Sequence, residues 1–337
     1  MTNAKPLPVQ MLDLINGYWV SKMVHVAAEM GLADALGDRA RTAAEVAGEV
    51  GADPERLHRM MRALTGVGVF SVDGDGRYAN TELGATLRSD RPDSMRDFAR
   101  MMPASYNWHG WDALDVGIRE QRTPFDEVFG MGGFAYLQQH PDDEAVFARA
   151  MASISGAENP AVAAALPLDG IGSLMDVGGS GGHLLAAVMQ QHAALRGVLF
   201  DQPQVVHGAK QAGYLQGLGE RVAFAGGDFF EAVPGGVDAY LMKYILHDWD
   251  DDRCVRILQN CRANLSADGR VFVVDNVVVE GNEPSWGKLL DVNMLVLTGG
   301  KERTEAEFAA LFARAGLRLD RVLATECPLG IVVGVPA

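Results

Sequence analysis

The chain has 337 residues, of which 48% are hydrophobic and 22% charged, and its formal net charge is −15. This length allows two domains with a large core, and the composition is typical of a globular protein. The negative charge argues against a nucleic-acid partner, because binding phosphates requires a basic face. The three cysteines have neither disulfide nor metal-site spacing. The sequence shows no apolar run of membrane-spanning length and no pattern of a secretory leader. We therefore expect a cytoplasmic protein without a membrane partner.

The N-terminal region has a helical pattern from Val9 to Leu36. Its large apolar side chains recur at helical spacing: Tyr18, Trp19, Met23, Val26 and Met30. A terminal helix with this much apolar surface packs either on the core of its own chain or on a second copy. We favour the second alternative and expect a homodimer.

Residues 42–70 predict a helix, a turn and a second helix. Thr42 and Glu45 form a capping box pattern at the first helix, and the second begins at Asp53-Pro54. Residues 69–79 predict a hairpin with a glycine-containing turn, which completes a winged helix. Such a unit can bind DNA, but residues 42–70 hold four acidic residues against three arginines, which disfavours that function.

Residues 92–160 are mostly helical in pattern and rich in large side chains. Most of these residues are expected to form a helical core. Phe147 and Met151, however, are four residues apart and therefore share one helical face. This pattern is typical of a linker helix that also forms the wall of an aromatic pocket.

From Ile171 onward, strand patterns and helix patterns alternate. Strands are expected near residues 172–177, 197–201, 221–225, 237–242, 269–276, 317–325 and 330–335. Helices are expected near residues 182–193, 203–212, 251–265 and 304–315. The alternation predicts an α/β fold with a doubly wound parallel sheet that ends in an antiparallel hairpin.

The first of these strands leads into a glycine turn and a helix, from Leu174 to Leu184. A strand, a glycine turn and a helix N-terminus receive nucleotides in open parallel sheets, although a βα turn without a ligand has the same pattern. Asp176 would repel a pyrophosphate but accept a cationic amino acid moiety. Asp201 ends the next strand, where a carboxylate can bind ribose hydroxyls. Together these residues favour S-adenosylmethionine over a nicotinamide dinucleotide.

Polar residues also follow the later strands. Asp228 lies after the third strand, where it can accept from an adenine amino group or simply stabilise a turn. Lys243 and His247 are four residues apart, which predicts that they share a helical face, and histidine suits a general base. A capping role for His247 is the alternative. Carboxylates at Asp275 and Glu302 can orient an imidazole from neighbouring loops.

Five motifs, taken together, resemble those of the caffeic-acid-type small-molecule O-methyltransferases. They are Asp-Val-Gly-Gly-Ser-Gly-Gly, Phe-Asp-Gln-Pro, Gly-Gly-Asp-Phe-Phe, Met-Lys-Tyr-Ile-Leu-His-Asp-Trp and Gly-Gly-Lys-Glu-Arg-Thr. The nearest similarity is to bacterial relatives that tailor anthracyclines, mitomycins and other aromatic natural products. The resemblance covers nearly the whole chain. It implies a winged-helix dimerisation domain over residues 1–100 and a Rossmann-like class I methyltransferase domain over 101–337, with a helical linker and pocket wall at 101–165 and a core at 166–337.

The resemblance also implies roles for individual residues. S-adenosylmethionine would be held by Gly178, Asp201, Asp228, Phe229 and Lys243. His247 would deprotonate an aromatic hydroxyl, flanked by Asp275 and Glu302. The acceptor pocket would include Phe147, Met151, Asp248, Met294 and Thr298. The sequence departs from the family at Ser180, where a third glycine is usual, and at Asp275, where plant enzymes have glutamate.

The predicted function is methyl transfer from S-adenosylmethionine to a hydroxylated aromatic small molecule, in a homodimer and without a metal. One alternative is a magnesium-assisted catechol methyltransferase, for which Asp248, Asp275 and Asn276 would supply oxygen ligands. A carbon or nitrogen methyltransferase on the same fold is another. A winged-helix regulator that senses a ligand is the non-enzyme alternative.

Overall fold

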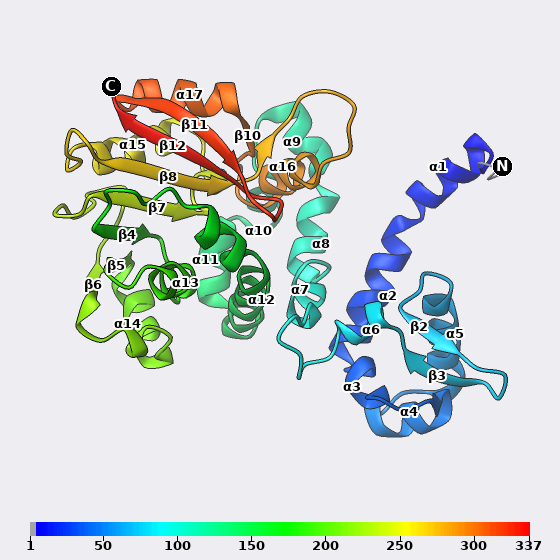
Figure 1. The fold of residues 1–337 in the computed structure, drawn as a ribbon. Helices are drawn as coiled ribbons and strands as arrows, with labels where there is room; N and C mark the ends of the chain where they lie inside the picture. Colours follow the sequence, from blue (N-terminus) through cyan, green and yellow to red (C-terminus); the bar gives the residue numbers. More distant parts are fainter. Residues whose placement is uncertain (1–4) are drawn as a thin grey trace. The chain divides into compact units, whose positions relative to one another are not determined.

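A computed structural model of the chain describes residues 5–337, which fall into two compact units (Figure 1). Within the described residues, the first unit comprises residues 5–109 and 137–154, and the second comprises 110–136 and 155–337. Three helices have residues in both units: α8 (Ser105–Asp112), α11 (Gly133–Gln139) and α12 (Pro141–Ala165). The single domain boundary expected near residue 100 stays a prediction.

The first unit is mainly helical and has a small sheet. Its helices are α1 (Leu7–Ile15), α2 (Gly17–Glu29), α3 (Leu32–Leu36), α4 (Ala43–Val50), α5 (Pro54–Thr65), α6 (Glu82–Ala85) and α7 (Arg96–Met101). Its strands are β1 (Arg41–Thr42), β2 (Phe70–Val72) and β3 (Arg77–Asn80), paired antiparallel in the order β1-β3-β2. The predicted helix–turn–helix and hairpin of the winged helix are therefore confirmed.

Local capping explains where these helices begin and end. The predicted capping box of Thr42 and Glu45 is present, and Asp53 caps α5. The prediction of one continuous helical stretch from Val9 to Leu36 was wrong, since the helix is interrupted at Asn16 and again at Gly31. Gly31 has φ +67°, a left-handed conformation that ends a helix at low cost only for glycine.

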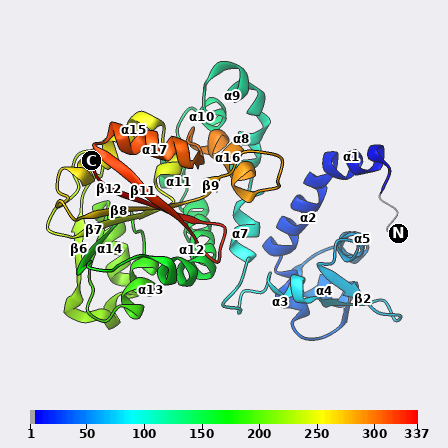
Figure 2. The same cartoon turned by 45° about the horizontal axis from the view of Figure 1, so that its top comes forward.

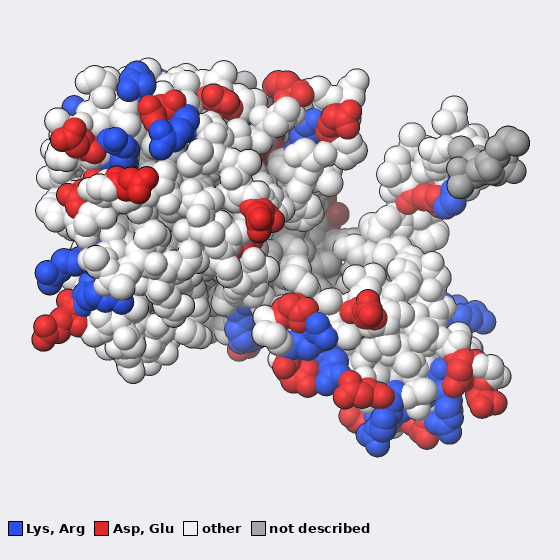
Figure 3. Space-filling model, in the orientation of Figure 1, with Lys and Arg blue, Asp and Glu red and all other residues white. Residues whose placement is uncertain are grey.

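Acidic and basic side chains alternate on the surface of the first unit. Figure 3 shows Lys and Arg interspersed with Asp and Glu on the face in view. Arg88 pairs with both Asp38 and Asp90, and Arg41 pairs with Glu49. Arg41 and Arg88 are thus each matched by neighbouring carboxylates, and the face in view shows no continuous basic stripe.

The second unit contains a seven-stranded sheet. Its strands are β4 (Ser173–Val177), β5 (Arg196–Asp201), β6 (Val222–Gly226), β7 (Ala239–Lys243), β8 (Arg270–Asp275), β11 (Leu317–Ala324) and β12 (Gly330–Pro336). Its helices are α9 (Leu114–Glu120), α10 (Pro124–Phe129), α13 (His183–Gln191), α14 (Pro203–Ala212), α15 (Asp251–Arg262), α16 (Trp286–Leu297) and α17 (Glu305–Arg314), with 3₁₀ turns η1 (Gln216–Arg221) and η2 (Leu246–Asp248).

The strand order of this sheet is β11-β12-β8-β7-β4-β5-β6. Strands β4 to β8 are parallel, whereas β11 and β12 form an antiparallel hairpin at one edge. This arrangement confirms the predicted doubly wound sheet and its terminal hairpin. Parallel strands need helical crossovers, so helices cover both faces, as Figures 1 and 2 show.

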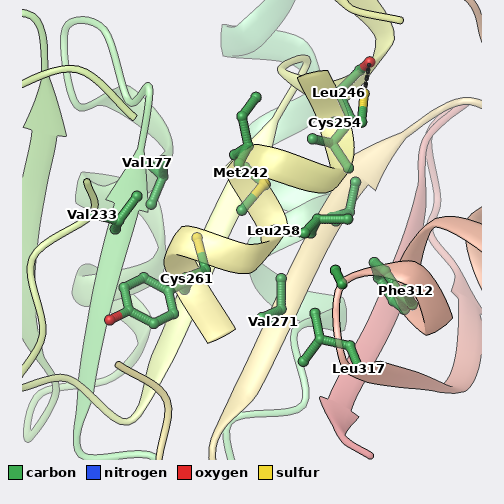
Figure 4. Close-up of a cluster of buried hydrophobic side chains, with 14 of the residues drawn as sticks. Val177, Val233, Met242, Leu246, Cys254, Leu258, Cys261, Val271, Phe312 and Leu317 are labelled. Carbon is green, nitrogen blue, oxygen red and sulfur yellow. Dashed lines mark hydrogen bonds between the residues drawn. The ribbon is translucent and has the colours of Figure 1, made fainter. Parts of the chain in front are cut away.

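The core of the second unit consists of two apolar clusters, one on each face of the sheet. Helices α15 and α17 cover one face, where they pack on alternate strand residues such as Met242 and Val271 (Figure 4). The end of α12, α13 and α14 cover the other face, to which Leu241 and Phe272 contribute. Alternation along each strand therefore fills both layers. Cys254 and Cys261 lie in the first cluster, as their helical spacing predicted.

Two features of this unit were not expected from the sequence. Helix α16 forms between residues 276 and 304, where no element was predicted, and a short parallel pair joins β9 (Val277–Val278) to β10 (Arg303–Thr304). The pairing places the Gly-Gly-Lys-Glu-Arg-Thr segment beside the end of β8. None of the helices within residues 5–337 is long and apolar enough to cross a bilayer.

Candidate active site

The predicted site residues follow the carboxyl ends of five neighbouring strands. Strands β4 to β8 are parallel, so their carboxyl ends share one edge of the sheet. Asp201, Lys243 and Asp275 are the last residues of β5, β7 and β8. Gly178 follows β4 directly, and Asp228 follows β6 after one residue. The topology thus brings together positions that are nearly 100 residues apart in the sequence.

The glycine turn after β4 lets the backbone come close to a ligand. Gly178 has φ +72°, and a Cβ atom there would lie 2.4 Å from the side chain of Ile245. A side chain at this position would therefore be strained by the left-handed backbone and would have to displace Ile245. Ser180, where the family resemblance led us to expect a glycine, also has a left-handed φ of +50°. Its N–H donates to Asp201 Oδ2 at 2.9 Å, which joins the turn to the end of β5.

The carboxylates of this region differ in their surroundings. Asp201 is mostly buried, which raises its pKa although two backbone N–H groups donate to it. Asp228 is exposed, and its Oδ1 accepts from the N–H of Phe230 at 2.8 Å, as in a turn aspartate. Asp176 lies beneath Gly179, and burial together with the charge of Asp201 raises its pKa to about 7. Its Oδ2 has no hydrogen-bond partner among residues 5–337.

Phe229 and Lys243 complete the predicted cofactor set. The Phe229 ring is half-buried and lies 4.8 Å from that of Phe230, centroid to centroid. The Lys243 ammonium pairs with Glu158 at 2.8 Å and also donates to Ser155 and Asn159 of α12. A glycine turn with left-handed backbone, together with carboxylates at two strand ends, fits the ribose and the cationic amino acid portion of S-adenosylmethionine.

The segment that carries His247 is not helical in the way the sequence predicted. Strand β7 ends at Lys243, Tyr244 takes a left-handed φ of +56°, and a 3₁₀ turn then covers Leu246–Asp248. The prediction that Lys243 and His247 share a helical face was therefore wrong. A strand end, a left-handed residue and a tight turn separate the two side chains, and each has its own acidic partner.

His247 is buried among carboxylates. Its Nδ1 lies 2.7 Å from Glu302 Oε1, and its Nε2 lies 3.8 Å from Asp248 Oδ1. Burial alone lowers the pKa of this imidazole. The charge of Asp248, the hydrogen bond to Glu302 and the charge of Asp275 outweigh that effect and raise the pKa to about 9. The arrangement can hold an imidazolium, because negative charge lies near both ring nitrogens.

Backbone contacts fix Glu302 against the His247 turn. The N–H of Lys301 donates to the carbonyl of His247 at 2.9 Å. A Cβ atom at Gly300 would lie 2.0 Å from that same carbonyl, so only glycine fits there. The fully buried Arg303 donates to the carbonyls of Leu246 and Trp249, on either side of the turn. The second glycine and the arginine of the motif thus hold two distant segments together.

Asp275 is held differently from Glu302. Its Oδ1 accepts from the N–H of Tyr244 at 3.0 Å, and its Oδ2 has no hydrogen-bond partner within residues 5–337. Burial raises the pKa of this carboxyl group, against the effect of His247. The direct hydrogen bond to the imidazole comes from Glu302, and Asp275 influences the imidazole through its charge.

The predicted acceptor residues fall in both units. Asp248 lies beside the imidazole, and Met294 is buried on α16. Thr298 caps that helix, where its hydroxyl donates to the carbonyl of Met294. Phe147 and Met151 lie on α12, in its part that belongs to the first unit. Their role in the pocket stays a prediction.

Three residues near His247 were missed by sequence reasoning: Glu158, Tyr244 and Arg303. Arg303 stood within a motif that the sequence analysis quoted, and its position directly after Glu302 was the available signal. Tyr244 carried no signal, since its left-handed backbone is visible only in the structure. Glu158 lies on α12 far from the motifs, and only the fold reveals its pairing with Lys243.

The sheet topology and the residues at its carboxyl edge define a class I methyltransferase. Residues 111–318 match the O-methyltransferase domain, and residues 12–90 match the O-methyltransferase dimerisation domain. The chain belongs to this O-methyltransferase family. It is an S-adenosylmethionine-dependent enzyme, in agreement with the expectation from its motifs.

Similar proteins come from natural-product biosynthesis. The phenazine O-methyltransferase of Lysobacter antibioticus is 39% identical over 99% of this chain and 97% of its own. The mitomycin biosynthesis 6-O-methyltransferase of Streptomyces lavendulae is 38% identical over 92% of this chain and 89% of its own. A methyltransferase of calicheamicin biosynthesis, solved with S-adenosylhomocysteine bound, is 38% identical, with a TM-score of 0.87 and 98% of each chain covered. The predicted relation to bacterial tailoring enzymes is thereby confirmed.

Proposed function

We propose that this enzyme methylates a hydroxyl group of an aromatic small molecule and that His247 is the general base. The observation that supports this function most is the buried pair of His247 and Glu302, 2.7 Å apart. Glu302 accepts a hydrogen bond from the N–H at Nδ1 and thereby leaves Nε2 as the position that can take a proton from an acceptor.

The cofactor would lie over the glycine turn, held by Gly178, Asp201, Asp228, Phe229 and Lys243. When bound, S-adenosylmethionine supplies a methyl group that a sulfonium makes electrophilic. The residues at the strand ends would orient that group relative to the acceptor hydroxyl. Holding reactants in line is worth several kcal/mol in such displacements, roughly 7–11 in the best intramolecular cases.

The raised pKa of His247 suits proton transfer from a phenol. A phenol ionises with a pKa near 10, and His247 has a pKa of about 9. The two values are close, so the proton moves from oxygen to Nε2 at little cost, and the oxygen becomes a strong nucleophile. Asp248, Asp275 and Glu302 would stabilise the imidazolium that forms. Asp248, Met294, Thr298, Phe147 and Met151 would line the acceptor pocket.

The test is an activity assay with purified protein, S-adenosylmethionine and a panel of hydroxylated phenazines, quinones and benzoates. We expect a mass gain of one methyl group on at least one acceptor. A ¹³C-labelled methyl donor then distinguishes an O-methyl from an N- or C-methyl product by its carbon shift. A product methylated only on carbon or nitrogen would overturn the proposal.

The same assay addresses the magnesium-assisted alternative. The described part of the chain has no cluster of three or more His, Cys, Asp or Glu residues suited to a metal ion. We expect turnover to be unchanged by EDTA. Loss of turnover that magnesium restores would favour the metal-assisted mechanism.

We further propose a homodimer formed through the N-terminal helices. Helix α1 has no buried residue, and the first two helices expose large apolar side chains: Leu7, Met11, Leu12, Leu14, Ile15, Tyr18 and Trp19. A permanent dimer interface buries at least about 2,000 Å² in total, which requires an apolar surface of this kind. Light scattering should give twice the chain mass. A monomer at micromolar concentration would contradict the proposal.

A further inference from the structure

Tyr244 has a strained backbone directly before the His247 turn. It is one of three non-glycine residues with positive φ among residues 5–337. A left-handed conformation costs such a residue about 1–2 kcal/mol and persists only where the surroundings enforce it. Here the Tyr244 N–H donates to the carbonyl of Val274 and to Asp275 Oδ1, at 3.1 and 3.0 Å. Strand β8 therefore holds the residue in this conformation.

The strained backbone places the Tyr244 ring against the imidazole of His247. The two rings are stacked, with centroids 5.0 Å apart and planes inclined by 25°. The hydrogen bond from Nδ1 to Glu302 fixes one direction within the imidazole plane but leaves the ring free to tilt about that direction. A flat neighbour on the ring face removes this freedom. Glu302 and Tyr244 together thus define the orientation of Nε2.

The far end of Tyr244 is anchored as well. Its hydroxyl donates to Glu158 Oε1 at 2.7 Å, and Glu158 Oε2 pairs with Lys243 at 2.8 Å. Burial and the charge of Glu158 raise the pKa of the Tyr244 hydroxyl above its usual value, so it stays protonated and keeps donating. The ring is therefore fixed at its backbone end by Asp275 and at its hydroxyl by Glu158.

We propose that Tyr244, anchored by Glu158, is a positioning residue that sets the plane of the His247 imidazole and so aims Nε2 at the acceptor oxygen. This inference rests on the proposed role of His247 as the general base. It assigns no chemistry to Tyr244 itself. Loss of the stacked ring should therefore impair only reactions that need the base.

The test compares two acceptors of nearly the same shape. One is a phenol that the panel assay identifies as a substrate, and the other is its ring-fluorinated analogue, whose more acidic hydroxyl is already ionised at the assay pH. Tyr244→Leu should lower turnover of the parent phenol by roughly 10–100-fold, since small misplacements cost about that much. Turnover of the ionised analogue should fall by less than about threefold, because that acceptor needs no base.

A neighbouring tyrosine provides the matched control. Tyr240 lies on strand β7, which ends directly before Tyr244; it is fully buried, and its hydroxyl donates to the carbonyl of Pro234 at 2.9 Å. Tyr240→Leu and Tyr240→Phe should affect both acceptors equally. Tyr244→Phe keeps the ring and loses only the anchor, so we expect a loss of about two- to fivefold on the parent phenol alone. This milder variant keeps the test decisive if Tyr244→Leu does not fold.

Two results would overturn the inference: equal losses on both acceptors in the Tyr244 variants, or no loss on either. His247→Ala separates this failure from a failure of the proposed function. If His247→Ala spares the ionised analogue but Tyr244→Leu does not, only the positioning role of Tyr244 is wrong. If His247→Ala also fails to distinguish the acceptors, the general base assignment is wrong.

Discussion

The two halves of the carboxyl edge are built in different ways. On the β4–β5–β6 side, Asp201 accepts from backbone N–H groups of Ser180 and Gln202, in the turns that follow β4 and β5. On the β7–β8 side, His247 is held by side chains from distant parts of the chain, of which Glu302 is 55 residues away. The first half offers preformed backbone geometry, whereas the second concentrates buried charge. Substitutions in the first should therefore weaken binding, and substitutions in the second should slow turnover.

The largest effect is expected at His247. His247→Ala should lower turnover by roughly 10²–10⁴-fold, because it removes the positioned base. The affinity for S-adenosylmethionine, measured by calorimetry, should change little, since His247 is not among the proposed cofactor residues and all of these except Lys243 lie on the other half of the edge. Wild-type turnover on a weakly acidic acceptor would contradict the base assignment.

The next effect is expected at Glu302 and is visible in the pH dependence. A base must be deprotonated to act, so kcat/KM should rise with pH until the pKa of His247, about 9, is passed. Glu302→Gln removes a charge and weakens a hydrogen bond that both raise this pKa, so the rise should shift to lower pH. Maximal turnover should fall roughly 10²-fold, because the imidazolium loses a neighbouring charge. An unshifted profile would show that Glu302 does not act on the base.

A smaller effect is expected in the cofactor half. Asp201→Ala should weaken S-adenosylmethionine binding by about 1–3 kcal/mol, because polar groups of ligand and turn lose their partner. Asp53→Ala serves as a control, since it removes a carboxylate that caps α5 in the first unit. Calorimetry decides the point: unchanged affinity, or a preference for a nicotinamide dinucleotide, would refute the cofactor assignment.

The smallest effect is expected at Ser180. This residue has φ +50°, a left-handed conformation that favours glycine. Ser180→Gly should relieve backbone strain but increase the entropy of the unfolded chain, so stability should change by less than about 1 kcal/mol. The N–H bond to Asp201 is retained, so cofactor affinity should stay within about twofold. Thermal unfolding and calorimetry measure both quantities, and a large loss of affinity would reveal a role for the hydroxyl.

Much of the fold was predictable because its signals are local. Strand patterns that end in a carboxylate, as at Asp201 and Asp275, predicted both the sheet and the edge where residues meet. The capping box pattern at Thr42 predicted the start of α4, which begins at the next residue. Helix α16 was not predicted, because residues 277–285 before it combine β-branched and loop-forming residues that show no clear helical or strand periodicity.

The site was predictable only in part, because the arrangement on the β7–β8 side of the carboxyl edge depends on contacts that form only when distant segments fold together. The sequence led us to expect that Asp275 or Glu302 orients an imidazole, and the family resemblance named His247, but only the structure shows that Glu302 makes the direct hydrogen bond. The strained turn at Tyr244 replaced the expected helical face, since strand β8 accommodates its N–H. The anchor at Glu158 depends on how α12 packs beside β7, and no pattern in either segment specifies that contact.

The short β9–β10 pair allows the segment that contains α16 to change in sequence while the position of Glu302 is retained. Its partners, Val277 with Arg303 and Val278 with Thr304, close a segment that includes α16, with Met294 and Thr298. Lengthening such a closed loop costs little free energy, because closure entropy grows only slowly with length. Insertions or new side chains between residues 279 and 298, apart from Asp291, whose Oδ1 accepts from the N–H of Glu302, can therefore reshape one wall of the proposed acceptor pocket while the pair keeps Glu302 in register with His247. A lineage can in this way acquire new acceptors without rebuilding its proton-transfer chemistry, and directed evolution of specificity should begin in this segment.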